Sequence, residues 1–147
     1  MKEDPKLIAG GGATYIAIAR RLRRFAETVP GREQLAIEAF ADGLETIPRV
    51  LAENAGMDSI DTLLQIVSIQ TQDDDDCIGL NVVTRQPENM RTSNIVEPAR
   101  VLGQAISGAS EATIAVLRID DVLWAKQEIS VPDDVQASLD GTAPDRR

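Results

Sequence analysis

The segment formed by residues 32–54 places the strongest constraint on how this chain can fold. Its apolar side chains recur at helical spacing but point in nearly all directions, so the segment predicts a helix that is apolar on several sides. Such a helix has to be covered by neighbours on more than one side, which predicts a central, buried helix. Pro48 is expected to kink or split it, because proline removes one backbone hydrogen bond and crowds the preceding turn. The apolar residues are Leu35, Ile37, Phe40, Leu44, Ile47, Val50 and Leu51.

Three further helices are predicted by the spacing of apolar residues and by capping signals. One spans about residues 13–28, a second runs from Asp58 or Ser59 to about Gln70, and a third starts at Glu97-Pro98. Proline suits the first position of a helix, where its missing N–H is harmless. The inner faces are expected to consist of Tyr15, Ile18, Leu22, Phe25 and Val29 in the first helix, Ile60, Leu63, Leu64 and Val67 in the second, and Leu102, Ala105, Ile106, Ala109, Thr113 and Val116 in the third.

A small amount of β-structure is expected beside these helices. Residues 78–84 are rich in β-branched side chains, and residues 89–95 could return as a partner strand, giving a hairpin. Residues 118–124 have the pattern of a short terminal strand, and residues 127–147 are expected to form a flexible acidic tail. The predicted fold class is therefore mainly α, with a small β-hairpin and a short terminal strand.

The charge of the chain argues against some classes of partner. The formal net charge is −9, whereas nucleic acids and anionic membranes are bound through lysine and arginine side chains that neutralise phosphate. We therefore expect neither nucleic acid nor a membrane as a partner, and no apolar run approaches the ~20 residues of a membrane-spanning helix. Aspartate outnumbers glutamate and arginine outnumbers lysine. A salt-rich cytoplasm, where screening offsets self-repulsion, and a GC-rich genome both account for this bias.

The chain contains one cysteine, Cys77, and no histidine. An internal disulfide is therefore impossible, and neither a Cys–His catalytic pair nor a usual zinc site can form. The N-terminus is too acidic and too poor in apolar residues for a signal peptide, and a cytoplasmic location is expected. The four carboxylates of residues 73–76 could hold Ca²⁺, but they lack the alternation and the glycine of a dedicated loop, which favours a solvated turn.

Three successive glycines, Gly10, Gly11 and Gly12, precede the first predicted helix. A backbone without side chains allows another chain or a flat ligand to approach closely. The N–H groups and the positive dipole end of the following helix point back to the same place. Such a run indicates either a tight turn or a ligand site, and the tight turn is the commoner of the two.

Several segments match one protein family in their order and spacing. They are Ala9-Gly10-Gly11-Gly12-Ala13, Gly31-Arg32-Glu33-Gln34-Leu35-Ala36-Ile37-Glu38-Ala39-Phe40-Ala41, Ile47-Pro48-Arg49, Leu51-Ala52-Glu53-Asn54-Ala55-Gly56, Gly79-Leu80-Asn81-Val82, Val96-Glu97-Pro98 and Leu117-Arg118-Ile119-Asp120-Asp121-Val122. Over residues 8–126 the sequence closely resembles the C-terminal part of group II chaperonin subunits, the archaeal thermosome and its eukaryotic relatives. The resemblance implies that residues 1–12 end a link to the intermediate domain, and that residues 13–126 are the C-terminal half of the equatorial, ATP-binding domain.

The resemblance also implies a ligand and a site. Group II chaperonins are rings of subunits that assist protein folding with ATP, so ATP or ADP, other chaperonin subunits and, through an apical domain, unfolded proteins are the implied partners. In the family the glycine run approaches the sugar and base of the nucleotide, and the hairpin segment lines the base pocket. An acidic residue contacts the ribose hydroxyls, because a carboxylate can accept a hydrogen bond from each of two hydroxyl groups. The residues implied here are Gly11, Gly12, Gly79, Leu80, Asn81, Val82 and Glu97.

The sequence departs from the family by the parts it lacks. The phosphate loop of the Gly-Asp-Gly-Thr type, its magnesium-binding aspartate and the aspartate that orients the attacking water have no counterpart here. Mg²⁺ is therefore expected to be held by the N-terminal part of a whole subunit. Phosphoryl transfer depends on charges placed around the phosphates and the metal, so no ATP hydrolysis is expected from this chain alone, and no catalytic or metal residue is assigned.

The missing parts also bear on the surface of the chain. Helix faces that they would cover should be apolar and exposed, and would drive association. Two other interpretations stay open at this point. The chain could be a truncated, non-catalytic remnant that acts only as an interaction module, or a small helical protein without a ligand.

Overall fold

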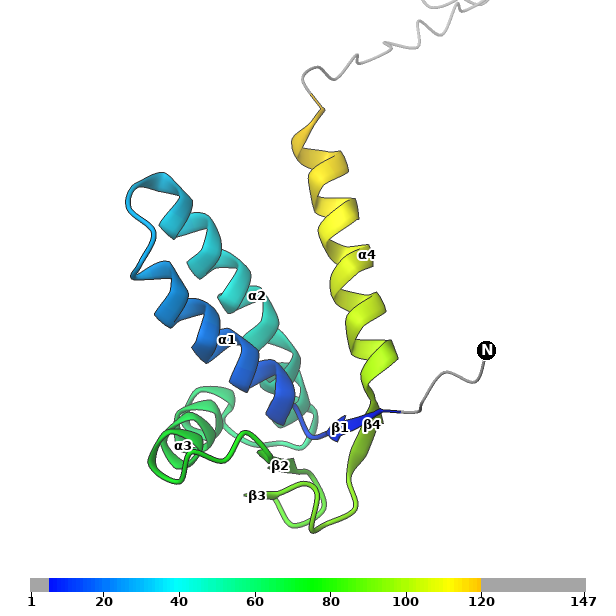
Figure 1. Ribbon diagram of the computed structural model, residues 1–147. Coiled ribbons are helices and arrows are strands. Elements are labelled where there is room, and N and C mark those ends of the chain that lie inside the picture. The colour runs from blue at the N-terminus through cyan, green and yellow to red at the C-terminus, as the bar shows by residue number, and fades with distance from the viewer. Residues whose placement is uncertain (1–5, 120–147) are drawn as a thin grey trace, which may run out of the picture. The chain divides into compact units, whose positions relative to one another are not determined.

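The computed structural model describes residues 6–119, which form four helices and two antiparallel two-stranded sheets (Figure 1). This confirms the predicted fold class of a mainly α protein with a small hairpin. The described residues divide into two units after Ser110, within the last helix, and each unit is considered by itself. The elements are β1 Leu7–Ala9, α1 Ala13–Ala26, α2 Arg32–Asn54, α3 Ser59–Gln72, β2 Ile78–Asn81, β3 Gln86–Asn89, β4 Val96–Pro98 and α4 Ala99–Leu117.

Helices α1 and α2 lie side by side (Figure 1). The buried cluster that they share contains two alanines, Ala19 and Ala41, beside Leu44. The predicted inner stripe of α1 is wrong in part, because Tyr15, Ile18 and Leu22 are only half-buried and Phe25 is 56% exposed. Alanine lets two helix backbones approach more closely than a large side chain does, so the alanine face is the one that packs inward. The buried residues of α1 are Ala13, Ile16, Ala17, Ala19 and Ala26.

Helix α2 is a single helix that runs through Pro48, so the expected split does not occur. One face is buried, through Ala41, Leu44, Glu45, Pro48 and Ala52. A second apolar stripe, formed by Phe40, Ile47 and Val50, is 43–50% exposed; we call it the outer stripe. The prediction of a helix that is apolar on several sides is therefore right, whereas the prediction of a buried, central helix is wrong within the described residues. The exposed stripe agrees with the expectation of uncovered apolar faces.

Helix α3 begins where predicted, because Asp58 caps it. The Asp58 carboxylate accepts hydrogen bonds from the backbone N–H groups of Ile60 and Asp61, both at 2.9 Å. Of the predicted inner residues, Leu63 is buried, whereas Ile60 and Leu64 are more than 60% exposed. The core that α3 shares with its neighbours consists of Ile16, Ala52, Leu63, Ile66, Ile78 and Leu80.

The two sheets differ from the prediction in their pairing. The hairpin joins β2 to β3, with Ile78 opposite Asn89 and Asn81 opposite Gln86. The predicted return strand at residues 89–95 is wrong, because the chain already turns after Asn81, and Arg85 has a φ of 58° in that turn. The following strand, β4, pairs instead with β1, a sheet that the sequence did not predict. Pro98 ends β4, so α4 begins one residue later than predicted, at Ala99.

The inner stripe predicted for α4 is mostly exposed. Leu102 is buried, and Ile106 is half-buried and packs against the cluster of Ala19, Ala41 and Leu44. No helix within residues 6–119 is long and apolar enough to cross a lipid bilayer. The predicted terminal strand falls largely, and the acidic tail entirely, outside the described residues.

Candidate functional site

The glycine run forms a tight turn between β1 and α1, and its backbone is enclosed by other parts of the chain. Gly11 and Gly12 have φ values of +60° and +76°, a region that favours glycine. A methyl group on Gly11 would lie 2.6 Å from the Leu80 carbonyl oxygen, and one on Gly12 would lie 2.7 Å from Cβ of Pro48. Both contacts are too short for a side chain. At these two Cα positions the space beside the glycines is therefore filled by β2 and α2 of the same chain.

Strand β2 is held against the glycine run by contacts between the two backbones. The Leu80 N–H donates to the Gly11 carbonyl at 2.8 Å. Gly79 allows this contact, because a methyl group there would lie 2.9 Å from the carbonyl oxygens of Gly10 and Gly11. Leu80 is 1% exposed and contributes its side chain to the core, so only its backbone can line a ligand site.

Glu97 reaches the same place from β4, where it lies opposite Ile8 in the β1–β4 sheet. A methyl group on Gly10 would lie 3.4 Å from Glu97 Oε1, so the carboxylate lies beside the glycine run. The Gly10 N–H donates to the Ile95 carbonyl at 2.9 Å and fixes this approach. Burial raises the pKa of Tyr15, and the negative charge of Glu97 raises it further. Glu97 therefore adds a half-buried carboxylate acceptor beside the glycine run.

Asn81 ends β2, and Val82 is the first residue of the hairpin turn. The Asn81 amide nitrogen donates to the Glu88 carboxylate, and its oxygen accepts from the Val83 N–H at 2.9 Å. Val82 is 42% exposed. The structure thus brings Gly11, Gly12, Gly79, Leu80 and Glu97 together around the glycine run, while the Asn81 side chain is engaged within the hairpin.

Two buried residues at this place were not predicted from the sequence. Met90 is 0% exposed and closes over Gly11, where a methyl group would lie 2.5 Å from its sulfur atom. Gln70 is also 0% exposed and donates to backbone carbonyls of α1 and β2. Met90 lies outside any periodic pattern, and Gln70 falls at the end of a helix, where a glutamine is usually solvated. In neither case does the sequence carry a signal that predicts a buried residue at this site.

The acidic loop at residues 73–76 is solvated only in part, which corrects the prediction: Asp73 and Asp74 are exposed, whereas Asp75 and Asp76 bond to other parts of the fold. Asp76 forms ion pairs with Arg20, at 2.7 Å, and with Arg21. The Cys77 backbone N–H donates to Asp75 at 2.9 Å and lowers the pKa of that carboxyl group, assisted by the Asn89 amide at 2.6 Å. Burial raises the pKa of the Cys77 thiol, and the charge of Asp75 adds to this. Residues 6–119 hold no group of three potential metal ligands of the His, Cys, Asp or Glu type.

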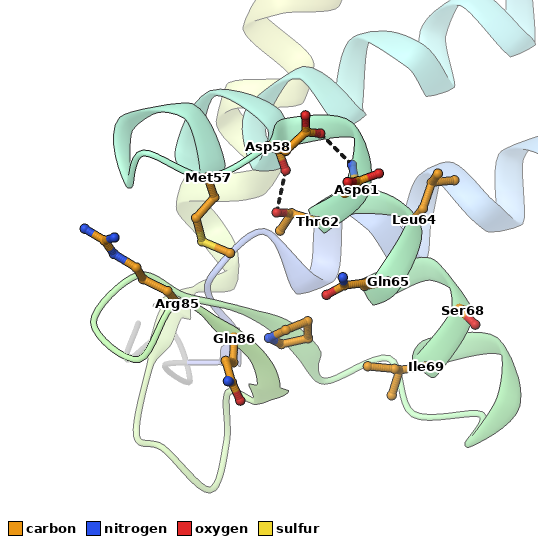
Figure 2. Close-up of a pocket in the computed structure, with 11 residues that line it drawn as sticks. Met57, Asp58, Asp61, Thr62, Leu64, Gln65, Ser68, Ile69, Arg85 and Gln86 are labelled. Atoms are coloured by element: carbon orange, nitrogen blue, oxygen red, sulfur yellow. Dashed lines mark hydrogen bonds between the residues drawn. The ribbon is translucent and has the colours of Figure 1, made fainter.

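A groove of about 870 Å³ lies elsewhere, between α3 and the β2–β3 turn (Figure 2). Figure 2 shows Asp58 at the edge of this groove. Its carboxylate accepts a hydrogen bond from the Asp61 backbone N–H, and its backbone carbonyl accepts one from the Thr62 hydroxyl. Asp58 is thus occupied in capping α3. The seven residues predicted for nucleotide binding take no part in lining this groove, whose walls are Met57, Asp58, Asp61, Thr62, Leu64, Gln65, Ser68, Ile69, Arg85, Gln86 and Pro87.

Comparison of the sequence with curated proteins finds thermosome subunits. The chain is 55% identical over 122 residues to thermosome subunit beta of Halobacterium salinarum, which covers 83% of this chain and 22% of that protein. It is 52% identical over 125 residues to a thermosome subunit of Methanothermococcus thermolithotrophicus, covering 85% of this chain and 23% of that one. The chain therefore spans less than a quarter of the length of these relatives.

The solved structures with a similar fold include two chaperonins. The open-state monomer of a group II chaperonin from Methanococcoides burtonii superposes with a TM-score of 0.74 at 44% identity, covering 78% of this chain and 28% of that one. A group III chaperonin in the open state gives a TM-score of 0.76 at 32% identity, covering 80% and 24%. The profile of the TCP-1/cpn60 chaperonin family matches residues 1–127. On this evidence the chain belongs to the TCP-1/cpn60 chaperonin family.

Proposed function

We propose that this chain supplies the adenosine side of the ATP or ADP site of a cytoplasmic group II chaperonin subunit. The observation that supports it is the meeting of β2 and Glu97 at the glycine run. This arrangement offers peptide backbone for a flat base and one carboxylate for the two ribose hydroxyls. Folding of unfolded proteins would then be an activity of the assembled chaperonin.

The phosphates and Mg²⁺ would be held by other parts of the subunit. The described residues contain no group of three His, Cys, Asp or Glu side chains placed to hold a metal ion, and the proposal assigns them no Mg²⁺ ligand. The relatives are four to five times as long as the matched segment, since it covers 22–23% of them. We therefore expect this chain to bind the nucleoside part of the nucleotide and to leave its phosphates unreacted.

Binding of AMP to the 147-residue chain tests this proposal. We expect AMP to shift the amide NMR signals of Gly10, Gly11 and Gly79, and Glu97→Gln to weaken binding by about tenfold. The reason is that hydrogen bonds to a charged acceptor contribute about 1.5–3 kcal/mol. The matched control is Glu33→Gln, an exposed carboxylate in the first turn of α2, which should leave the affinity unchanged. Equal affinities for the wild-type chain and Glu97→Gln would contradict the assignment of the ribose contact.

We further propose that the outer stripe of α2 is a contact surface of the chaperonin particle. Phe40, Ile47 and Val50 follow one another along one face of the helix and are each 43–50% exposed. Single exposed apolar residues need no explanation, whereas an apolar row at helical spacing indicates a surface that is covered in the working protein. Other subunits of the particle are the proposed cover.

The native mass of the chain, measured by light scattering in molar KCl with ATP, tests this second part. We expect the chain to form particles of more than one copy, because high salt screens the formal charge of −9 that would otherwise keep copies apart. Replacing Ile47 and Val50 by glutamine should reduce the mass towards that of a monomer. Val83→Gln, at a side chain 87% exposed in the hairpin turn, serves as the control and should not. A monomer for every variant would support the alternative of a chain that needs other parts before it assembles.

A further inference from the structure

We propose that Gln70 is a positioning residue for the nucleotide site, because it holds β2 at a fixed place against the glycine run. Gln70 lies in the last turn of α3 and is 0% exposed. Its amide nitrogen donates to the carbonyl of Ile78 at 2.7 Å and to that of Ala13 at 3.1 Å. Ile78 is the first residue of β2, and Ala13 is the first residue of α1, directly after the glycines. One side chain therefore ties together the two segments proposed to contact the nucleotide.

The bonds act on the edge of β2 that faces away from β3. In a strand, the N–H and C=O groups of alternate residues point to the same edge, so the Ile78 carbonyl and the Leu80 N–H share one. The Gly11 carbonyl accepts from the Leu80 N–H at 2.8 Å, and Gln70 donates to the Ile78 carbonyl. The same edge of β2 is therefore hydrogen-bonded at Leu80 by the backbone of the glycine run and at Ile78 by the side chain of Gln70.

The chemistry of the amide explains why a glutamine suits this position. The Ile78 carbonyl lies on the edge of β2 that β3 does not pair, whereas the Ala13 carbonyl lies in the first turn of α1, and a primary amide can donate to both from one nitrogen atom. The Gln70 oxygen is buried and has no hydrogen-bond partner in the described chain, so only the donors tie the segments together. A buried carbonyl that loses its donor costs more free energy than the bond itself contributes. Methionine has a similar length and no donor, so Gln70→Met removes the two bonds and little else.

Amide hydrogen exchange separates positioning from a general effect on stability. In Gln70→Met we expect the Leu80 N–H to exchange roughly tenfold faster, because its bond to Gly11 is no longer held in place, while the Leu44 N–H within α2 exchanges as before. The control is Gln72→Met, an exposed glutamine of the same helix turn that donates to Ser68 at 3.1 Å. It should change neither amide.

The outcomes decide the role of Gln70 independently of the ligand. Faster exchange at Leu80 alone, together with weaker AMP binding in Gln70→Met, supports the proposal. Equal acceleration at Leu80 and Leu44 overturns it, because Gln70 would then only stabilise the whole fold, and so does no change at Leu80. The significance for a nucleotide rests on the proposed function. A wild-type chain that does not bind AMP would refute that function, while the exchange ratio would still decide whether Gln70 holds β2 on the glycine run.

Discussion

Replacement of Gly79 by alanine is expected to lower the free energy of unfolding by about 3 kcal/mol, one of the two largest effects predicted for this chain. The added methyl group would lie 2.9 Å from Cβ of Ala13 and from the carbonyl oxygens of Gly10 and Gly11. Two of these neighbours are backbone atoms in a tight turn, so they cannot yield as the end of a flexible side chain could. Relief requires β2 to move off the glycine run, which breaks the Leu80–Gly11 hydrogen bond.

Urea unfolding followed by circular dichroism measures this loss, and Gly43→Ala is the matched control. Gly43 lies within α2, and a methyl group there meets no atom within 4 Å. Alanine is the better helix former, so Gly43→Ala should stabilise the chain by about 0.5–1 kcal/mol. The same chemical change should therefore have opposite signs at the two positions. A Gly79→Ala variant as stable as the wild type would mean that β2 does not pack on the glycine run as described.

The helix boundaries could be predicted well because local signals mark them. Gly31 and Gly56 flank α2, and both have positive φ values of 92° and 70°. Asp58 caps α3 as expected from its sequence position. The burial of the helix faces was predicted less well, because periodicity reports where large apolar residues recur and not which face comes closest to a neighbour. In α1 the face that packs inward carries alanines, and the larger side chains flank it.

The sheet pairing could not be predicted for a different reason. Strands β1 and β4 have three residues each and lie almost 90 residues apart in the sequence, as the pairing of Ala9 with Val96 shows. Such short strands have no measurable alternation, and their pairing is fixed by the structure around them. At the candidate site, too, some residues are marked by the local sequence and others are placed only by the surrounding structure. The glycines could be identified from their run in the sequence, whereas the buried residues that enclose them could not. At a helix end the sequence predicts an exposed Gln70, and it makes no prediction for Met90.

The arginines of α1 are a further case in which the sequence left the role undetermined. Arginine side chains crowd residues 20–24, and a solvated face is the usual reading of such a cluster. In the structure Arg23 bonds to Asp42, at 2.7 Å, and to Glu45, both on α2. The hydrogen bond that Arg23 donates to the Glu45 carboxylate raises the pKa of Arg23, with burial acting in the opposite direction. These pairs join α1 to α2 at a place where charge, and not only the alanine face, determines their contact.

Arg23→Met is the second change for which we expect a large effect. The Glu45 side chain is 4% exposed, and without Arg23 it keeps only Arg49 of its own helix, at 3.3 Å. Breaking one side of a buried ion pair leaves a charge that is poorly compensated, which costs about 3–5 kcal/mol. Arg23 is 39% exposed, so solvent reduces this figure, and we expect a loss of about 2 kcal/mol in the free energy of unfolding.

The double variant Arg23→Met, Glu45→Met shows whether the loss comes from the uncompensated charge. A methionine pair of similar volume removes both charges together, and such replacements of buried ion pairs are often neutral or stabilising. We therefore expect the double variant to recover most of the stability that Arg23→Met loses, while Arg24→Met, on an exposed arginine of the same helix, stays close to the wild type. Urea unfolding of the wild type, Arg23→Met, Glu45→Met and the double variant gives the coupling energy directly. If the double variant were as unstable as the sum of its two single changes, Glu45 and Arg23 would be acting independently, and the alanine packing alone would hold α1 on α2.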